Sequence, residues 1–341
     1  TQSRSSAASD VYKRQVLQLA ERTCPEPGKG EVVIDVEACG ICGADIFDID
    51  NVNPNLSPPR VPGHEVIGRI VALGTDVPNR WSIGQRVGVG RLGGPCYVCD
   101  FCRQGHFQQC SDQPVVGSSM DGGYAEVMLV RASGLVSIPD ELNSIEAAPI
   151  LCAGVATFNA LKKCGAQAGD TVAVLGVGGL GHMAIQYAKR MGYKVVSIGR
   201  GDDIRQLAFA LGAHEYIDTN TQPLDEELQR IGYLDAAIVT INESTLTTAL
   251  FNHLSPKGKM VILGAGKVPL VFSSGAMVSG ERHILGSITG TPYENEKALN
   301  FSVLAHVKPM IETMPFEHAN EAFQKMKSGK ANFRIVLTMK N

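Results

Sequence analysis

Residues 171–191 read TVAVLGVGGLGHMAIQYAKRM, and this stretch decides the fold class. A short apolar run at 171–175 has the length and composition of a buried strand, and beyond the glycines apolar residues recur at helical spacing. In this strand–turn–helix context, GxGxxG is typical of a loop that binds a dinucleotide pyrophosphate at a helix N-terminus. The alternative, a turn that serves only helix–strand packing, fits this context less well. The candidate cofactor residues in the loop are Gly176, Gly178, Gly179, Leu180 and Gly181.

The sequence around this loop alternates between strand and helix patterns. Short apolar runs predict further strands at residues 194–198, 236–240, 260–263 and 284–288. Helices are expected at 146–161 and at 204–211, where Gly212 ends the second one. Such alternation is typical of βαβ units on a parallel sheet, so residues 151–288 are predicted to form a doubly wound α/β domain.

The N-terminal part of the chain has a different character. Strand-like runs occur at 31–36, 65–72, 85–89 and 123–130, with proline and glycine between them. This pattern predicts a mostly β domain over residues 1–150. Within it, residues 1–15 are a polar leader that we interpret as disordered or as a tag or cloning scar, outside the fold. Residues 289–341 contain two helix-like stretches and a last strand-like run.

Composition limits the function classes. At 341 residues the chain is long enough for two domains. Lys and Arg number 31 against 34 Asp and Glu, so a net charge of −3 offers no basic surplus for nucleic acid or an anionic membrane surface. No apolar run approaches the roughly 18 residues of a membrane span. The nine cysteines are odd in number and clustered, and no secretory apolar stretch occurs at the start, so we expect a reducing, cytoplasmic compartment.

Four of the cysteines are spaced CxxCxxCx7C. Four thiolates this close together in a loop can close a tetrahedron around zinc, and with no open coordination position the site would be structural. An iron–sulfur cluster and free core cysteines are the alternatives, and the spacing favours zinc. The predicted ligands are Cys96, Cys99, Cys102 and Cys110.

A second set of metal-binding side chains is scattered along the chain. Cys42 lies in CGICGAD, His64 and Glu65 lie in PGHE, and Cys152 lies in PILCAG. Two thiolates, an imidazole and a neighbouring carboxylate, with one position open, are donors typical of catalytic zinc. Asp45 is a natural acceptor for the free N–H of His64. Each residue alone is more often an ordinary core residue, and the spacing does not show that positions 42, 64 and 152 meet.

The strand after the glycine loop ends in Ser197-Ile-Gly199-Arg200. An Asp or Glu at this tip would bind the ribose hydroxyls of NAD. Here Gly199 leaves room for a 2′-phosphate and Arg200 can pair with it, which favours NADP(H) over NAD(H). The alternative is that Arg200 is a solvated loop charge and that Asp202 or Asp203 reaches the ribose.

Together these motifs resemble the zinc-dependent alcohol dehydrogenases of the medium-chain dehydrogenase/reductase family, from about Val16 to the end of the chain. The residues that carry the resemblance are Gly40-Ile-Cys42, Gly63-His-Glu65, the four-cysteine segment, Leu151-Cys-Ala-Gly154 and Gly176-Val-Gly-Gly-Leu-Gly181. The resemblance implies a GroES-like catalytic domain, built from residues 1–150 and 289–341, around an inserted Rossmann domain. It implies catalytic zinc on Cys42, His64 and Cys152, with Glu65 as an alternate or near ligand, and thus two zinc ions per chain. It further implies that Arg334 lies near the cofactor phosphates.

The sequence departs from the family pattern at positions near the site. Where the family usually has a Ser or Thr that binds the substrate oxygen and starts a proton relay, this chain has Ala44. A histidine often found slightly further on is replaced by Phe47, which with the loop 48–60 is expected to border the substrate pocket. The threonine that commonly touches the nicotinamide is replaced by Ala156, which leaves Thr157 beside it as the candidate.

The resemblance implies a zinc-dependent oxidoreductase that transfers hydride between a primary or secondary alcohol or aldehyde and a nicotinamide cofactor. A cinnamyl-type aldehyde reductase is one alternative, and the missing hydroxyl at Ala44 leaves open a non-catalytic zinc- and nucleotide-binding relative. A zincless quinone reductase is less compatible, because it would not need Cys42, His64 and Cys152. The expected partners are a small-molecule substrate and further copies of the chain, as a dimer or tetramer, with no nucleic acid and no membrane.

Overall fold

The computed structural model describes residues 17–50 and 59–339. The expected leader, residues 1–15, lies outside the described residues, as do positions 51–58 of the expected pocket loop. The chain divides into two compact units. The first comprises residues 1–152, 290–300 and 310–341, and the second comprises residues 153–289 and 301–309.

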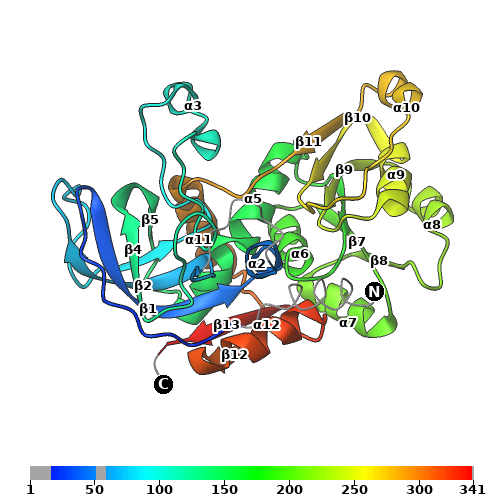
Figure 1. Cartoon of the computed structure of the whole chain (residues 1–341). Coiled ribbons are helices and arrows are strands. Elements are labelled where there is room, and N and C mark those ends of the chain that lie inside the picture. Colours follow the sequence, from blue (N-terminus) through cyan, green and yellow to red (C-terminus); the bar gives the residue numbers. More distant parts are fainter. Residues whose placement is uncertain (1–16, 51–58, 340–341) are drawn as a thin grey trace, which may run out of the picture. The chain divides into compact units, whose positions relative to one another are not determined.

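The first unit is built around a seven-stranded sheet in the order β12-β13-β1-β2-β3-β5, with β4 pairing with β1. Its strands are β1 (Glu31–Ile41), β2 (Glu65–Leu73), β3 (Arg86–Val89), β4 (Val127–Arg131), β5 (Leu135–Ser137), β12 (Ile311–Pro315) and β13 (Arg334–Thr338). Its short helices include α2 (Asp45–Ile49), α3 (Asp100–Arg103), η1 (Phe107–Gln109), η2 (Ala132–Gly134), η4 (Phe316–His318) and α12 (Ala319–Lys327). Strand β13 lies antiparallel beside β1, so segments from both ends of the chain share one sheet (Figure 1). The predicted mostly β unit with a C-terminal contribution is confirmed.

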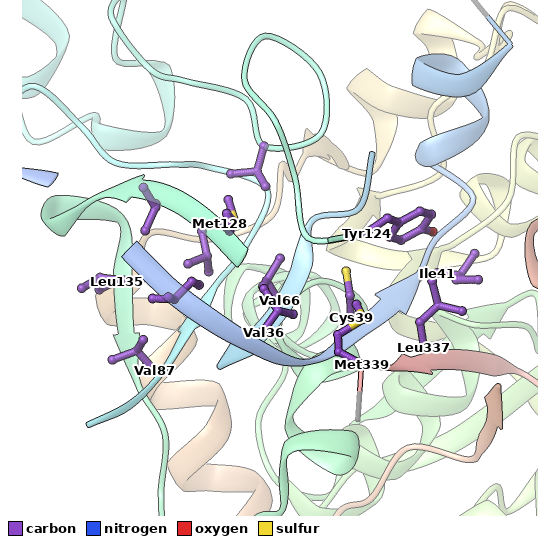
Figure 2. Close-up of a cluster of buried hydrophobic side chains, with 14 of the residues drawn as sticks. Val36, Cys39, Ile41, Val66, Val87, Tyr124, Met128, Leu135, Leu337 and Met339 are labelled. Carbon is purple, nitrogen blue, oxygen red and sulfur yellow. The ribbon is translucent and has the colours of Figure 1, made fainter. Parts of the chain in front are cut away.

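The core of the first unit is formed along β1. Val36, Cys39 and Ile41 belong to one buried hydrophobic cluster with side chains of β2, β3, β4 and β13 (Figure 2). β-Branched residues are frequent in this cluster because their stiff side chains pack well on a pleated surface. Tyr124 also belongs to the cluster. Strand β1 therefore ends one residue before Cys42, and its packing in the core fixes the position of that cysteine.

The second unit is a six-stranded sheet in the order β11-β10-β9-β6-β7-β8, and each neighbouring pair is parallel. Its strands are β6 (Thr171–Leu175), β7 (Lys194–Gly199), β8 (Glu215–Asp218), β9 (Leu234–Val239), β10 (Leu254–Ile262) and β11 (His283–Gly286). Its helices are α5 (Ala153–Cys164), α6 (Gly181–Arg190), α7 (Asp202–Leu211), α8 (Leu224–Ile231), α9 (Ser244–Asn252) and α10 (Ser274–Ser279). The strand order reverses at β6, and ligands of doubly wound sheets bind beyond the carboxyl ends of the strands at such a point. The predicted doubly wound sheet is confirmed.

The prediction of a single helix over residues 146–161 is wrong. The structure has α4 (Ser144–Ala147), a 3-10 turn η3 (Ala148–Leu151), and then α5. Pro149 has no N–H to donate, and Cys152 has φ −128° and ψ −76°, outside the helical region. The break therefore presents Cys152 at a junction instead of within a helix. No single helix among the described residues is long and apolar enough to cross a membrane, and this bent pair passes by length and composition alone.

The C-terminal boundary differs from the expected one. The sequence predicts that residues 289–341 return to the first unit as one piece, but residues 301–309 belong to the second unit. The reason is the second half of α11 (Pro292–Ala305), which packs on helices of the second unit. The ring of Phe301 is centred 5.3 Å from that of Phe158, and Ser302 Oγ lies 2.7 Å from the hydroxyl of Tyr187.

Candidate functional site

Four predicted metal ligands meet in the first unit. Cys42 follows β1, His64 directly precedes β2, Glu65 begins β2, and Cys152 lies at the junction before α5. One ligand atom of each lies within 4.8 Å of the others, and the two Sγ atoms are 3.7 Å apart. Antiparallel pairing of β1 with β2, with Gly40 opposite Glu65, brings the first two segments together. The convergence that the spacing could not show is therefore produced by sheet pairing and by the helix break.

The imidazole of His64 is held by the carboxylate of Asp45. Nδ1 of His64 lies 2.8 Å from Oδ1 of Asp45, and both side chains are fully buried. The other oxygen of Asp45 accepts hydrogen bonds from the backbone N–H of Cys42 and from the hydroxyl of Tyr124, both at 2.9 Å. Nε2 of His64 is buried and has no hydrogen-bond partner among the residues that the structure describes. One ring nitrogen fixed by a carboxylate and the other buried without a partner are the arrangement of a metal-ligating histidine.

The charges in this cluster favour a bound cation. Burial opposes the charged imidazolium, but the carboxylate of Asp45 and the sulfur of Cys42 together raise the pKa of His64 to about 10. A hydrogen bond from Cys152 lowers the pKa of the Cys42 thiol well below its usual value. The same hydrogen bond, together with burial, raises the pKa of the Cys152 thiol. Metal ligands must be deprotonated, so a bound divalent cation would displace protons from these groups.

Glu65 faces the same cluster with its two oxygens in different environments. Oε1 forms a buried ion pair with Arg334 of β13, whereas Oε2 is buried and has no hydrogen-bond partner within residues 17–50 and 59–339. Burial raises the pKa of Glu65 to about 7 against the opposing effect of Arg334. A side chain at Gly40 would place its Cβ 2.0 Å from Oε2. The glycine of the Gly-Ile-Cys motif is thus required by the close approach of Glu65.

Two residues expected at the cofactor have other partners in the structure. Arg334 is 4% exposed, and its guanidinium pairs with Glu65. Thr157 is buried in α5, where its hydroxyl donates to the backbone carbonyls of Ala153 at 2.7 Å and Gly154 at 3.1 Å. Contacts of Arg334 and Thr157 with a cofactor therefore stay predictions.

A buried ion pair beside His64 was missed by the sequence reasoning. The guanidinium of Arg91 contacts both oxygens of Asp48, with Nη2 at 3.1 Å from Oδ1, and Nη1 lies 3.4 Å from Nδ1 of His64. The side chain of Asp48 is 1% exposed and that of Arg91 is 20% exposed. Asp48 lies in the run DIFDID at 45–50, and a carboxylate that is buried there needs a partner. No pattern in the sequence predicts that Arg91 is that partner.

The four-cysteine segment forms a second thiol cluster, on the lobe that carries α3 (Figure 1). Its four sulfur atoms lie within 4.8 Å of one another, and none of them is in a disulfide. The backbone N–H of Cys96 points to Sγ of Cys110 at 3.3 Å, and that of Cys99 points to Sγ of Cys96 at 3.4 Å. Backbone hydrogen bonds to its sulfur lower the pKa of Cys99 to about 6. Four converging sulfurs, supported by N–H donors, fit a closed tetrahedral zinc site.

In the second unit the glycine loop joins β6 to α6. Gly176 has φ +94°, and a side chain at Gly181 would place its Cβ 1.8 Å from the carbonyl oxygen of Gly176. A Cβ at Gly178 would meet no atom within 4 Å, so the loop is open at that position. A tight turn against the helix and an open glycine fit a pyrophosphate at the N-terminus of α6.

The carboxyl end of β7 carries no acidic side chain. Gly199 ends the strand, and Arg200 is exposed in the turn before α7. Asp202 and Asp203 are exposed in the first turn of α7, and Oδ1 of Asp202 lies 3.1 Å from Nε of Arg205. The carboxylate of Asp202 is therefore already engaged within its own helix.

Two protein families match successive parts of the chain. Residues 28–140 match the Alcohol dehydrogenase GroES-like domain, and residues 179–303 match the Zinc-binding dehydrogenase family. The alcohol dehydrogenase notN of Aspergillus sp. (strain MF297-2) is 41% identical over 337 residues, which cover 96% of this chain and 98% of the relative. An alcohol dehydrogenase of Geobacillus stearothermophilus is 37% identical over 332 residues, which cover 96% of this chain and 97% of the relative.

Solved structures share the fold over most of the chain. A cinnamyl alcohol dehydrogenase from Sorghum bicolor is 29% identical with a TM-score of 0.85, covering 93% of this chain and 92% of its own. An acetophenone reductase from Geotrichum candidum, in complex with NAD, is 28% identical with a TM-score of 0.84, covering 94% and 93%. A CAD from Helicobacter pylori, complexed with NADP(H), is 29% identical with a TM-score of 0.82, covering 93% and 92%.

Proposed function

The chain belongs to the zinc-containing alcohol dehydrogenases of the medium-chain dehydrogenase/reductase family, and from this membership we propose that it transfers hydride between primary or secondary alcohols, or aldehydes, and NADP(H). It is an alcohol oxidoreductase that uses zinc and a nicotinamide cofactor. The metal-binding residues, the number of zinc ions and the preference for NADP(H) are our proposal. The observation that carries it is the meeting of Cys42, His64 and Cys152, with Nε2 of His64 buried and without a hydrogen-bond partner in the described part of the chain.

We assign the catalytic zinc to Cys42, His64 and Cys152, with Glu65 as an alternate or near ligand. Two sulfurs and one nitrogen, with a position left for substrate, are the donors typical of catalytic zinc in alcohol dehydrogenase. When bound, zinc supplies Lewis-acid polarisation of the substrate oxygen. The chain's own contribution is to orient: Asp45 fixes the ring and tautomer of His64.

A second zinc is assigned to the four-cysteine cluster. Its four sulfurs leave no position for a substrate, so the role proposed for this metal is structural. Backbone N–H donors at Cys96 and Cys99 support thiolates over thiols there. We therefore expect two zinc ions per chain, of which only the one at Cys42, His64 and Cys152 takes part in the reaction.

Ala44 bears on the route of the substrate proton. Alcohol oxidation removes the hydroxyl proton, and an alanine side chain neither donates nor accepts a hydrogen bond. We propose that water in the site takes up this proton, since water can bridge polar groups nearly as well as a direct contact. Oxidation is then slow at neutral pH and rises as hydroxide becomes available.

The cofactor preference rests on Gly199 and Arg200. A charge-assisted hydrogen bond from Arg200 to a 2′-phosphate would contribute about 1.5–3 kcal/mol, or roughly ten- to a hundredfold in affinity. Structural relatives occur with NAD and with NADP(H), so likeness alone does not choose between the two. The absence of a carboxylate at the end of β7 supports NADP(H).

A cinnamyl-type aldehyde reductase is the second candidate within the same chemistry. It is favoured by the structural likeness to the Sorghum cinnamyl alcohol dehydrogenase and by the proposed use of NADPH. The non-catalytic alternative is set aside, because the family is enzymatic and both ligand sets are complete. A homo-oligomeric state and a cytoplasmic location stay predictions.

The experiment is a pair of kinetic assays at 340 nm. NADPH and NADH are compared with a panel of aliphatic and cinnamyl-type aldehydes, and the reverse direction is followed with the matching alcohols. The proposal expects a higher kcat/KM with NADPH than with NADH, and Arg200→Ala is expected to reduce the difference. A higher kcat/KM with NADH in the parent protein overturns the cofactor assignment, and no turnover of any aldehyde or alcohol overturns the substrate class.

A further inference from the structure

We propose that Tyr216 is a specificity-determining residue for the cofactor, because its buried hydroxyl occupies the space that a side chain at position 199 would need. The inference rests on the proposed preference for NADP(H) and deepens it. Positions 199 and 216, on neighbouring strands, would together exclude a ribose-binding carboxylate, so Gly199 alone does not determine the preference.

The steric relationship between the two positions is direct. Strands β7 and β8 are parallel neighbours, with Gly199 opposite Asp218 and Ser197 opposite Tyr216. A Cβ built on Gly199 would lie 2.8 Å from the hydroxyl oxygen of Tyr216 and 3.1 Å from its Cε2. The same Cβ would lie 3.1 Å from Cγ2 of Val177 in the glycine loop. A residue larger than glycine therefore meets the phenol on one side and the loop on the other.

Tyr216 is not free to move aside. Its side chain is buried, with 4% of the residue exposed, and its hydroxyl donates to the carbonyl oxygen of Gly201 at 3.1 Å. The guanidinium carbon of Arg205 lies 5.1 Å from the ring centroid, within range of a cation–π contact. Moving the phenol would break the hydrogen bond to Gly201 and the contact with Arg205.

Strand β8 also holds the turn that presents Arg200. The carboxylate of Asp218 accepts from the backbone N–H of Gly201 at 3.0 Å. Thr219 donates to the carbonyl oxygen of Gly199 from its backbone N–H at 3.0 Å and from its hydroxyl at 3.1 Å. Arg200 thus lies between Gly199 and Gly201, whose backbone groups are hydrogen-bonded, and its own side chain is exposed. The guanidinium of Arg200 is therefore accessible to an anion such as a 2′-phosphate.

A carboxylate at position 199 is the group expected to bind both ribose hydroxyls of NAD. In this chain that carboxylate enters only if the hydroxyl of Tyr216 is removed. Gly199→Asp alone should therefore destabilise the fold and bring little affinity for NAD, whereas Gly199→Asp combined with Tyr216→Phe should accommodate the carboxylate.

The test is a double-mutant cycle with binding and stability as readouts. The four proteins are the parent, Gly199→Asp, Tyr216→Phe and the double variant, and the probes are ADP-ribose and 2′-phospho-ADP-ribose, which lack the nicotinamide. We expect Gly199→Asp to lower Tm by several degrees and the added Tyr216→Phe to restore most of that loss. We expect the double variant to bind ADP-ribose about tenfold more tightly than Gly199→Asp does. If Gly199→Asp alone keeps the parent Tm and gains the same affinity for ADP-ribose, the inference is overturned.

A smaller change keeps the test decisive if Gly199→Asp does not fold. Gly199→Ala adds only the Cβ, and its loss in Tm should be smaller in the Tyr216→Phe background than in the parent background. Equal losses in the two backgrounds contradict the steric pairing. Failure of the underlying cofactor proposal looks different: the parent would bind ADP-ribose as tightly as 2′-phospho-ADP-ribose, while the coupling of positions 199 and 216 in Tm would persist.

Discussion

The Sγ atoms of Cys42 and Cys152 lie 3.7 Å apart, although 110 positions separate the two residues in the chain. Cys42 is delivered by the end of β1, and Cys152 by the helix break that Pro149 introduces. Without a metal, the two sulfurs at this distance can share one hydrogen bond, whereas two thiolates held this close need a cation between them. The distance is therefore the geometric basis of the proposed catalytic zinc site.

Asp45→Asn tests the role assigned to the carboxylate behind His64. The variant keeps the size of the side chain but removes the charge that fixes the ring, so metal affinity should fall by about 10–100-fold. Tyr124→Phe is the matched control, because it removes one neutral donor to the same carboxylate and should have a smaller effect. Both are measured by competition for the metal with a chelator. Equal affinities in the parent and Asp45→Asn would show that the carboxylate does not orient a ligand.

Ala44→Ser tests the missing proton carrier. A hydroxyl at this position should raise alcohol oxidation several-fold at neutral pH, because a positioned proton-transfer group typically contributes about 10²–10⁴-fold and water recovers only part of this. Serine is also well tolerated in the turn before α2, where Ala44 stands as the N-cap. The readout is the pH–rate profile of both proteins at saturating cofactor, with Ala44→Gly as control. Profiles that coincide in height and shape would rule out the missing relay.

Arg91→Met tests the buried pair beside His64. The change leaves the carboxylate of Asp48 buried and unpaired, so the free energy of unfolding should fall by about 3–5 kcal/mol. Replacing both partners, as Arg91→Met with Asp48→Leu, should recover most of the loss. The exposed pair of Lys29 and Asp76, with side chains 79% and 65% exposed, supplies the control, and Lys29→Met should cost less than about 1 kcal/mol. Urea unfolding measures all of these, and a loss in Arg91→Met no larger than in Lys29→Met would contradict the prediction.

Asp218→Asn tests the turn before Arg200 through its pH dependence. Backbone N–H donors of Gly201 and Asn220 lower the pKa of Asp218 below its ordinary value of 3.8. A lowered folded-state pKa means that the carboxylate stabilises the fold above its unfolded-state pKa, and that this stability is lost as the pH falls through the folded-state pKa. The Tm of Asp218→Asn should therefore lie below that of the parent at neutral pH and approach it in acid. Asp203→Asn, at an exposed carboxylate, is the control. A Tm difference between Asp218→Asn and the parent that stays constant with pH would contradict the stabilising role of the Asp218 carboxylate.

Much of the fold could be predicted because local patterns and global topology agree in this chain. The glycine loop between a short apolar run and an amphipathic helix predicts a doubly wound sheet, and β6 and α6 form there. The break at Pro149 was missed because the apolar pattern continues through it, and periodicity does not register a missing N–H donor. The assignment of residues 301–309 was missed because it depends on the packing of Phe301 against Phe158, which is a tertiary contact.

In the candidate site, too, local residue types could be predicted but tertiary contacts could not. Residue types predicted the donors, since Cys, His and a neighbouring carboxylate are what zinc binds. Their partners could not be predicted, because the hydroxyl of Tyr124 reaches Asp45 from 79 positions away, and Arg91 reaches Asp48 from 43 positions away. Tyr216 gave no signal either, since its effect on Gly199 depends on the register of two parallel strands.

The zinc content per chain of the parent protein and of Cys152→Ser, determined by elemental analysis of the purified, folded proteins, tests the assignment of the catalytic zinc to Cys42, His64 and Cys152. We expect two zinc ions in the parent and one in Cys152→Ser, with the four-cysteine cluster keeping its metal in both. One zinc in the parent, unchanged in Cys152→Ser, with the thiol of Cys42 freely alkylated in the native protein, would contradict that assignment.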